Sequence, residues 1–139
     1  MISDADIFRA LSAFLEQHQP FSPALRIAYP KMNFKPSNKE KYLRVSFLPT
    51  PTQTMFLAGG DDSHSGTFQV DVCVPAEDTG LPEVLDMAAA IVGTFMSERV
   101  PMSNGRKIKI GTAPRVAAMV TDSVRPFVPV SIPYQISTS

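Results

Sequence analysis

The stretch GTFQVDVCVP, residues 66–75, is the clearest strand signal in the sequence. Apolar side chains alternate with others along it, so in an extended chain one side carries Phe68, Val70, Val72 and Val74. The other side carries Thr67, Gln69, Asp71 and Cys73. Pro75 ends the strand because proline has no N–H to donate. The pattern predicts a strand with one face on a hydrophobic core.

Further strand patterns lie on both sides of this stretch. The expected segments are 25–28, 41–49, 52–58, 106–110, 115–121 and 124–137. The last of them contains Pro126, Pro129 and Pro133. Because proline cannot donate to a ladder, we predict a C-terminal edge strand over about 124–137, or one that is bulged or paired on one side only.

Two amphipathic helices are expected, over about residues 4–18 and 81–97. Ser3 and Asp6 resemble a capping box at the start of the first. Pro82 suits the first turn of the second. Its expected core stripe is Leu81, Leu85, Ala88, Ile91, Val92 and Phe95. The order of elements predicts a single α+β domain over 1–139, with a mostly antiparallel (mixed) β-sheet and two helices packed on it.

Composition narrows the class of protein. The chain has 139 residues, 13 prolines and one cysteine, Cys73, so it forms no internal disulfide. The N-terminus lacks the basic region of a signal peptide. The longest apolar run, Met87 to Met96, is too short to span a bilayer. We therefore expect a soluble intracellular product without a membrane partner.

Charges are sorted along the chain although the net charge is zero. Residues 57–90 contain acidic residues and no Lys or Arg, whereas 99–115 contain basic residues and no Asp or Glu. Residues 22–46 are also basic, with Glu40 as the single acid. Either these blocks neutralise one another within one subunit, or an acidic face meets a basic face on the next subunit.

The polar segment AGGDDSHSG, residues 58–66, is the place where chemistry is most easily imagined. A zinc site needs about four ligands, and Asp61, Asp62 and His64 have no second cluster to complete them. Neighbouring residues rarely converge into a rigid Ser-His-Asp arrangement, and no phosphate-loop spacing is present. Because no catalytic or metal constellation emerges, we expect no enzyme activity and no cofactor.

The landmarks together resemble the tail-terminator-like (tail completion) proteins of long-tailed bacteriophages. The resemblance covers about residues 41–138 and is carried by YLRVSFLP, SGTFQVDVCVPAEDTG, the helix ending at Phe95, GRKIKIGTAP and RPFVPVSIPYQIS. It implies a structural virion protein that forms a ring, typically of six subunits, on the last ring of the tail tube. Such a ring ends tube polymerisation and joins the head, and DNA passes through its channel without sequence-specific binding.

The implied partners are other copies of the chain, the major tail tube protein and a head-completion protein. Assembly is expected in the host bacterial cytoplasm. A head-completion or other minor tail protein on a similar fold is the alternative, and a small metal-dependent hydrolase using the Asp61–His64 loop is a more distant one.

Two sets of residues are candidates for assembly contacts. The first is a flexible hairpin loop over 58–66, facing the channel or a neighbour: Gly59, Gly60, Asp61, Asp62, Ser63, His64, Ser65 and Gly66. Its aspartates would repel the DNA backbone and help DNA slide. The second is a subunit interface in which acids near Asp61, Asp62, Glu77 and Asp78 meet Arg99, Arg106, Lys107 and Lys109.

Overall fold

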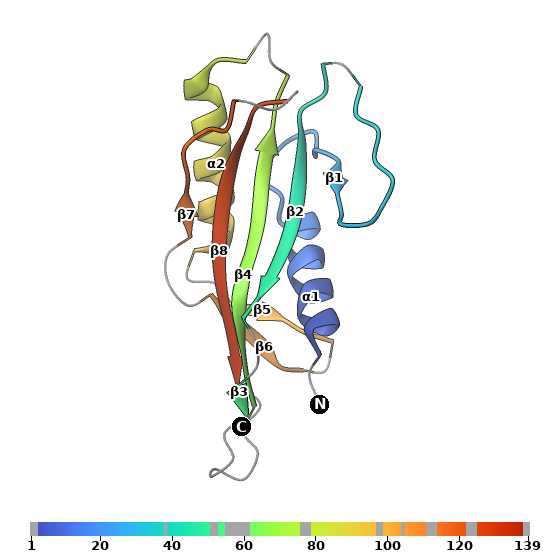
Figure 1. The fold of residues 1–139 in the computed structure, drawn as a ribbon, viewed down its shortest axis with the longest axis vertical. Coiled ribbons are helices and arrows are strands. Elements are labelled where there is room, and N and C mark those ends of the chain that lie inside the picture. The colour runs from blue at the N-terminus through green and yellow to red at the C-terminus, as the bar shows by residue number, and fades with distance from the viewer. Residues whose placement is uncertain are drawn as a thin grey trace.

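The computed structural model describes residues 3–37, 39–50, 53–54, 62–75, 79–96, 99–103, 105–110, 114–121 and 125–137. Within them, two helices and eight strands follow one another along the chain (Figure 1). In order they are α1 (Asp4–Gln17), β1 (Ile27–Ala28), β2 (Tyr42–Pro49), β3 (Gln53–Thr54), β4 (Asp62–Cys73), α2 (Leu81–Phe95), β5 (Arg99–Pro101), β6 (Lys107–Ile110), β7 (Arg115–Val116) and β8 (Phe127–Ser137).

The strands form one mixed sheet in the order β1-β2-β4-β8-β6-β5, with β3 beside β4 and β7 beside β8. Strand β1 runs parallel to β2, and the other described pairs are antiparallel. Figure 1 shows β2, β4 and β8 as the long central strands, with both helices behind them. The α+β fold class expected from the sequence is confirmed.

The core lies between the sheet and the helices. Strand β4 buries Phe68, Val70 and Val72 of the predicted face, and Val74, just after the strand, is also buried. Strand β8 buries Val128, Val130, Ile132, Tyr134 and Ile136. Phe14 of α1 and Phe95 of α2 meet above this face with ring centroids 5.2 Å apart. Both helices therefore cover the same side of the sheet.

Helix α1 begins and ends close to where the sequence places it. The Ser3 hydroxyl accepts from the Asp6 N–H at 3.2 Å, and the Asp6 carboxylate accepts from the Ser3 N–H at 3.2 Å. This reciprocal pair is the predicted capping box. The buried residues are Ile7, Leu11, Ser12, Phe14 and Leu15.

Helix α2 has the expected extent but a different core-facing stripe. It buries Val84, Ala88, Ile91 and Phe95, whereas Leu81 and Leu85 are 50% and 40% exposed. The prediction that Leu81 and Leu85 face the core is wrong. Apolar residues continue around most of this helix, so helical spacing alone does not decide which stripe packs on the sheet.

The prediction that β8 is an edge strand is also wrong. It lies inside the sheet, with β4 along one flank and β7 and β6 along the other. The Pro129 carbonyl accepts from the Ala117 N–H at 2.9 Å, so the backbone of Pro129 faces β7. Pro133, four residues later, faces the same flank. Among the described strands, β7 pairs with residues 130–131 and β6 with 134–135, so Pro133 lies between the two pairings.

Much of the predicted flexible loop over 58–66 belongs to strand β4. Gly66 lies opposite Pro49 of β2 and Tyr134 of β8, and Ser63, His64 and Ser65 also pair with β8. A Cβ at Gly66 would lie 2.6 Å from the Leu48 carbonyl oxygen and 2.7 Å from the Tyr134 hydroxyl. Glycine is therefore required here for close packing, and the loop prediction is wrong for residues 62–66. Residues 58–61 lie outside the described part.

Candidate assembly surfaces

The ion pairs show which charged blocks neutralise each other within the chain. Lys41 Nζ lies 2.5 Å from Glu83 Oε1, and Arg44 donates to Asp71 through Nε at 3.0 Å and Nη2 at 2.9 Å. These contacts join the acidic block to the first basic block, residues 22–46. Part of the expected charge pairing therefore occurs inside one subunit.

Asp71 is the most buried of these charges, with a side chain 3% exposed. In addition to Arg44, it accepts from Gln69 Nε2 at 2.8 Å, and the Arg44 guanidinium lies 4.5 Å from the centre of the Phe127 ring. Because both carboxylate oxygens have donors, the burial of Asp71 is compensated. The arrangement ties β2, β4 and β8 together on the sheet face away from the helices.

The second basic block forms a surface that we call the basic hairpin: Arg99 on β5 with Lys107 and Lys109 on β6. Arg99 lies directly opposite Lys109 in the register, and the alternating residues Val100, Ile108 and Ile110 are buried. The three cations are therefore exposed on the other side of the hairpin. None of the ion pairs between described residues involves them. Like charges in opposed positions destabilise a sheet, so this surface favours an anionic partner.

The other predicted interface residues are placed only in part. Arg106 precedes β6 and is exposed, next to the basic hairpin. Glu77 and Asp78 lie outside the described residues, as do Gly59, Gly60 and Asp61. The proposed pairing of these acids with the basic residues stays a prediction.

His64 lies within β4 near the start of α1. Its Nδ1 is 3.6 Å from Asp4 Oδ1, and its side chain is 12% exposed. The strand alternation directs Ser65 to the opposite face of the sheet from His64. Within the described ranges, no group of three or more His, Cys, Asp or Glu side chains gathers as metal ligands. His64 therefore contacts α1 from β4, while Ser65 lies on the other face of the sheet.

Cys73 faces away from the core in the alternation but is covered, with 1% exposure. Burial raises the pKa of its thiol to about 11. Since the thiolate is the reactive form, a thiol with this pKa is inert near neutral pH. Cys73 is therefore a covered, unreactive residue of β4.

Two arginines hold the basic segment between β1 and β2 in place. Arg26 donates to the Glu40 carboxylate through Nε at 2.6 Å and Nη2 at 2.7 Å, and to the Lys35 carbonyl at 3.0 Å. Arg125 donates to the backbone carbonyls of Glu40 and Ser37. The Arg26 guanidinium lowers the pKa of Glu40 to about 2. The segment is therefore anchored at several points.

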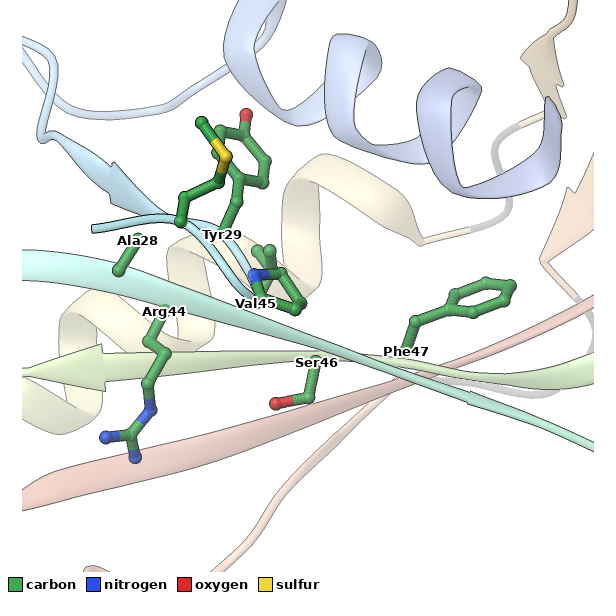
Figure 2. Close-up of a pocket in the computed structure, with 8 residues that line it drawn as sticks. Ala28, Tyr29, Arg44, Val45, Ser46 and Phe47 are labelled. Carbon is green, nitrogen blue, oxygen red and sulfur yellow. The ribbon is translucent and has the colours of Figure 1, made fainter. Parts of the chain in front are cut away.

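This anchored segment forms one wall of an open groove of about 510 Å³, shown in Figure 2. We call it the β1–β2 groove; its lining is mainly apolar and comprises Ala28, Tyr29, Pro30, Met32, Arg44, Val45, Ser46 and Phe47. The Tyr29 hydroxyl donates to Glu16 of α1, which fixes one side of the groove. Met32 is 69% exposed, and Leu48, just beyond Phe47, is 54% exposed.

A second exposed apolar surface lies on α2. We call it the α2 ridge, and it comprises Leu81, Leu85, Ala89, Gly93 and Met96 at the helix end. Met96 is 48% exposed. Val116 of β7, which packs against α2, is 39% exposed. We did not predict this ridge from the sequence. The available signal was that α2 contains only two charged residues, Glu83 and Asp86.

No helix in the described part of the chain is long and apolar enough to cross a membrane.

Comparison with known proteins agrees with the fold. A family model described as "Phage tail terminator protein" matches residues 6–134, nearly the whole chain. A solved structure whose name states no function superposes with a TM-score of 0.76 and 26% sequence identity. That alignment covers 97% of this chain and 96% of the other. No curated protein matches the chain in sequence.

Proposed function

We propose that this chain, which belongs to the phage tail terminator family, caps the tail tube as a ring. The ring ends tube polymerisation and provides the surface that joins the head. The family is one of structural proteins of the phage tail, so the chain is a tail component of the virion. In this proposal it assembles in the host cytoplasm, and its partners are other copies of itself, the tail tube protein and a head-completion protein.

The basic hairpin is the observation that carries the ring proposal. Arg99, Lys107 and Lys109 share one exposed face and make no ion pair within the described chain. A neighbouring copy supplies acidic residues from the block 57–90, of which Asp71 and Glu83 are already paired internally. Contact between unlike faces of identical subunits is head-to-tail, and such contacts close into rings.

The remaining acids of that block are proposed to serve the ring in two places. Glu77 and Asp78, which precede α2 in the chain, face the basic hairpin of the next copy. In this proposal Asp61 and Asp62 face the channel together with the glycines before them in the sequence, Gly59 and Gly60. Negative charge there repels the DNA backbone, so DNA passes without being held.

Tail length is the direct test of this function. Tails assembled without the chain are expected to have tubes of unregulated length in electron micrographs, whereas tails assembled with it have one length. Tubes of normal length in its absence would contradict the proposal. Tubes of normal length that fail to join heads would instead assign a head-completion role.

Charge reversal tests the interface. The double variant Lys107→Glu/Lys109→Glu is expected to lose length control, because two cations of the basic hairpin become anions opposite an acidic neighbour. Lys35→Glu/Lys39→Glu is the matched control, since it makes the same change in net charge at two exposed positions that lie outside the hairpin and are not lining residues of the β1–β2 groove. If the hairpin variant regulates length as the control does, the assigned charge pairing is wrong.

A further inference from the structure

Helix α2 carries two apolar faces, and the chain itself uses one of them. Val84, Ala88, Ile91 and Phe95 are fully buried against the sheet. The successive residues of the α2 ridge are four, four, four and three positions apart in the sequence. This spacing places them about a quarter turn or more around the helix axis from the buried residues. A helix that is apolar on nearly all sides is normally buried on all sides. The apolar composition of the ridge therefore indicates a partner surface that the described part of the chain does not supply.

Gly93 on the ridge points to the same conclusion independently. A glycine within a helix costs stability relative to alanine. A Cβ at Gly93 would meet no atom within 4 Å, so packing inside the chain does not require glycine there. With Ala89 one turn earlier, Gly93 forms a low point between Leu85 and Met96. Small residues at such positions let another surface approach the helix closely.

The chain offers a matching concave surface on its other side. In Figure 1, α2 and β7 lie on one side of the central strands, and β1 with the segment after it lies on the opposite side. That opposite side contains the β1–β2 groove, whose apolar lining includes exposed Met32 and lies next to exposed Leu48. Its volume of about 510 Å³ accommodates several side chains of a ridge.

The charges around the two surfaces are complementary. Helix α2 contains Glu83 and Asp86 and no basic residue. Asp86 borders the ridge and takes part in none of the ion pairs between described residues. Lys31 adjoins the groove between Pro30 and Met32, is exposed, and likewise has no such pair. The ridge thus has an acidic border and the groove a basic one, so the two surfaces are complementary in charge.

We propose that the α2 ridge of one copy seats in the β1–β2 groove of the next copy. The contact joins two different surfaces on opposite sides of the chain, which is the head-to-tail geometry that a closed ring needs. The inference rests on the ring of the proposed function and adds a second, apolar contact to the charge pairing of the basic hairpin. Asp86 then lies near Lys31 at the border of the contact.

Cysteine cross-linking tests the contact directly. Met32→Cys and Leu85→Cys place one thiol in the groove and one on the ridge, both at exposed positions that the fold tolerates. Tails assembled with the double variant are treated with a short bismaleimide, dissociated and separated on a denaturing gel. A ladder up to the ring size is expected, because every copy carries both thiols. The buried Cys73 does not react, so wild-type tails give no ladder.

Controls fix the geometry of the contact. A mixture of the two single variants should give cross-linked dimers, and each single variant alone should give none. A dimer from Leu85→Cys alone would mean that two α2 helices face each other, which overturns the proposal. Arg9→Cys/Leu85→Cys is the matched control, because Arg9 is exposed on α1 outside the groove, and it should give no ladder.

The outcomes separate this inference from the proposed function. If tails made with the Met32→Cys/Leu85→Cys variant have regulated length but give no ladder, the ridge does not seat in the groove, while the capping role stands. If tails made without the chain have normal length, the capping role fails whatever the cross-linking shows.

Discussion

Replacing Gly93 by alanine is expected to stabilise the free protein. The residue lies within α2, and a Cβ there would meet nothing within 4 Å. The methyl group therefore adds no clash, while alanine loses less backbone entropy on folding than glycine does. The expected gain in the free energy of unfolding is about 0.5–1 kcal/mol.

Urea denaturation of the unassembled protein measures this gain. With an m-value of about 2 kcal/mol/M, the midpoint should rise by about 0.25–0.5 M at an unchanged slope. A midpoint that stays the same or falls would refute the reasoning, because it would mean that glycine is needed at this position within the chain.

The same substitution is expected to act in the opposite direction on assembly. On the α2 ridge the added methyl occupies space that the proposed neighbour uses, so capping of tubes should weaken while the isolated chain becomes more stable. Length control in tails made with the Gly93→Ala variant is the measurement. Full length control in these tails would mean that no partner approaches Gly93 closely.

Gly66→Ala should destabilise the protein by about 1–3 kcal/mol, because its Cβ would overlap the Leu48 carbonyl and the Tyr134 hydroxyl; a urea midpoint equal to wild type would contradict this packing. The Cys73 thiol, whose pKa burial raises to about 11, should not react with a thiol reagent at pH 8 until urea unfolds the chain; rapid labelling of the native protein would show that it is accessible. The hydrogen bonds from Arg26 are the main reason that the pKa of Glu40 is lowered to about 2. The stabilisation from this ion pair is therefore fully present above about pH 4.5 and is lost as the pH falls towards 2. In an NMR titration Arg26→Gln should raise the pKa of Glu40 towards its ordinary value, and an unchanged pKa would assign the shift to another group.

Local patterns predicted those features that depend on neighbours along the chain. Alternation in residues 66–75 identified the buried face of β4, and the Ser3–Asp6 spacing identified the start of α1. Alternation also explains the basic hairpin, since the residue between Lys107 and Lys109 is buried Ile108.

Features that depend on distant partners could not be read in this way. The composition of residues 62–66 is typical of a loop, but pairing with residues 134–137 of β8 makes the segment a strand. Proline in β8 suggested an edge because the sequence does not show that β7 and β6 pair around Pro133. The β1–β2 groove brings together residues 28–32 and 44–47, and neither segment alone predicts a concave surface.

The prolines of the sheet limit which strand flanks can pair with another molecule. Pro129 and Pro133 leave the β7–β6 flank of β8 without two N–H donors, and Pro49 ends β2 at the other side of the central strands. Unpaired donors and acceptors along a strand recruit strands from other molecules, and proline removes that recruitment. In the gap that the β7 and β6 pairings leave on this flank of β8, Pro133 therefore offers no N–H donor to a strand of another copy.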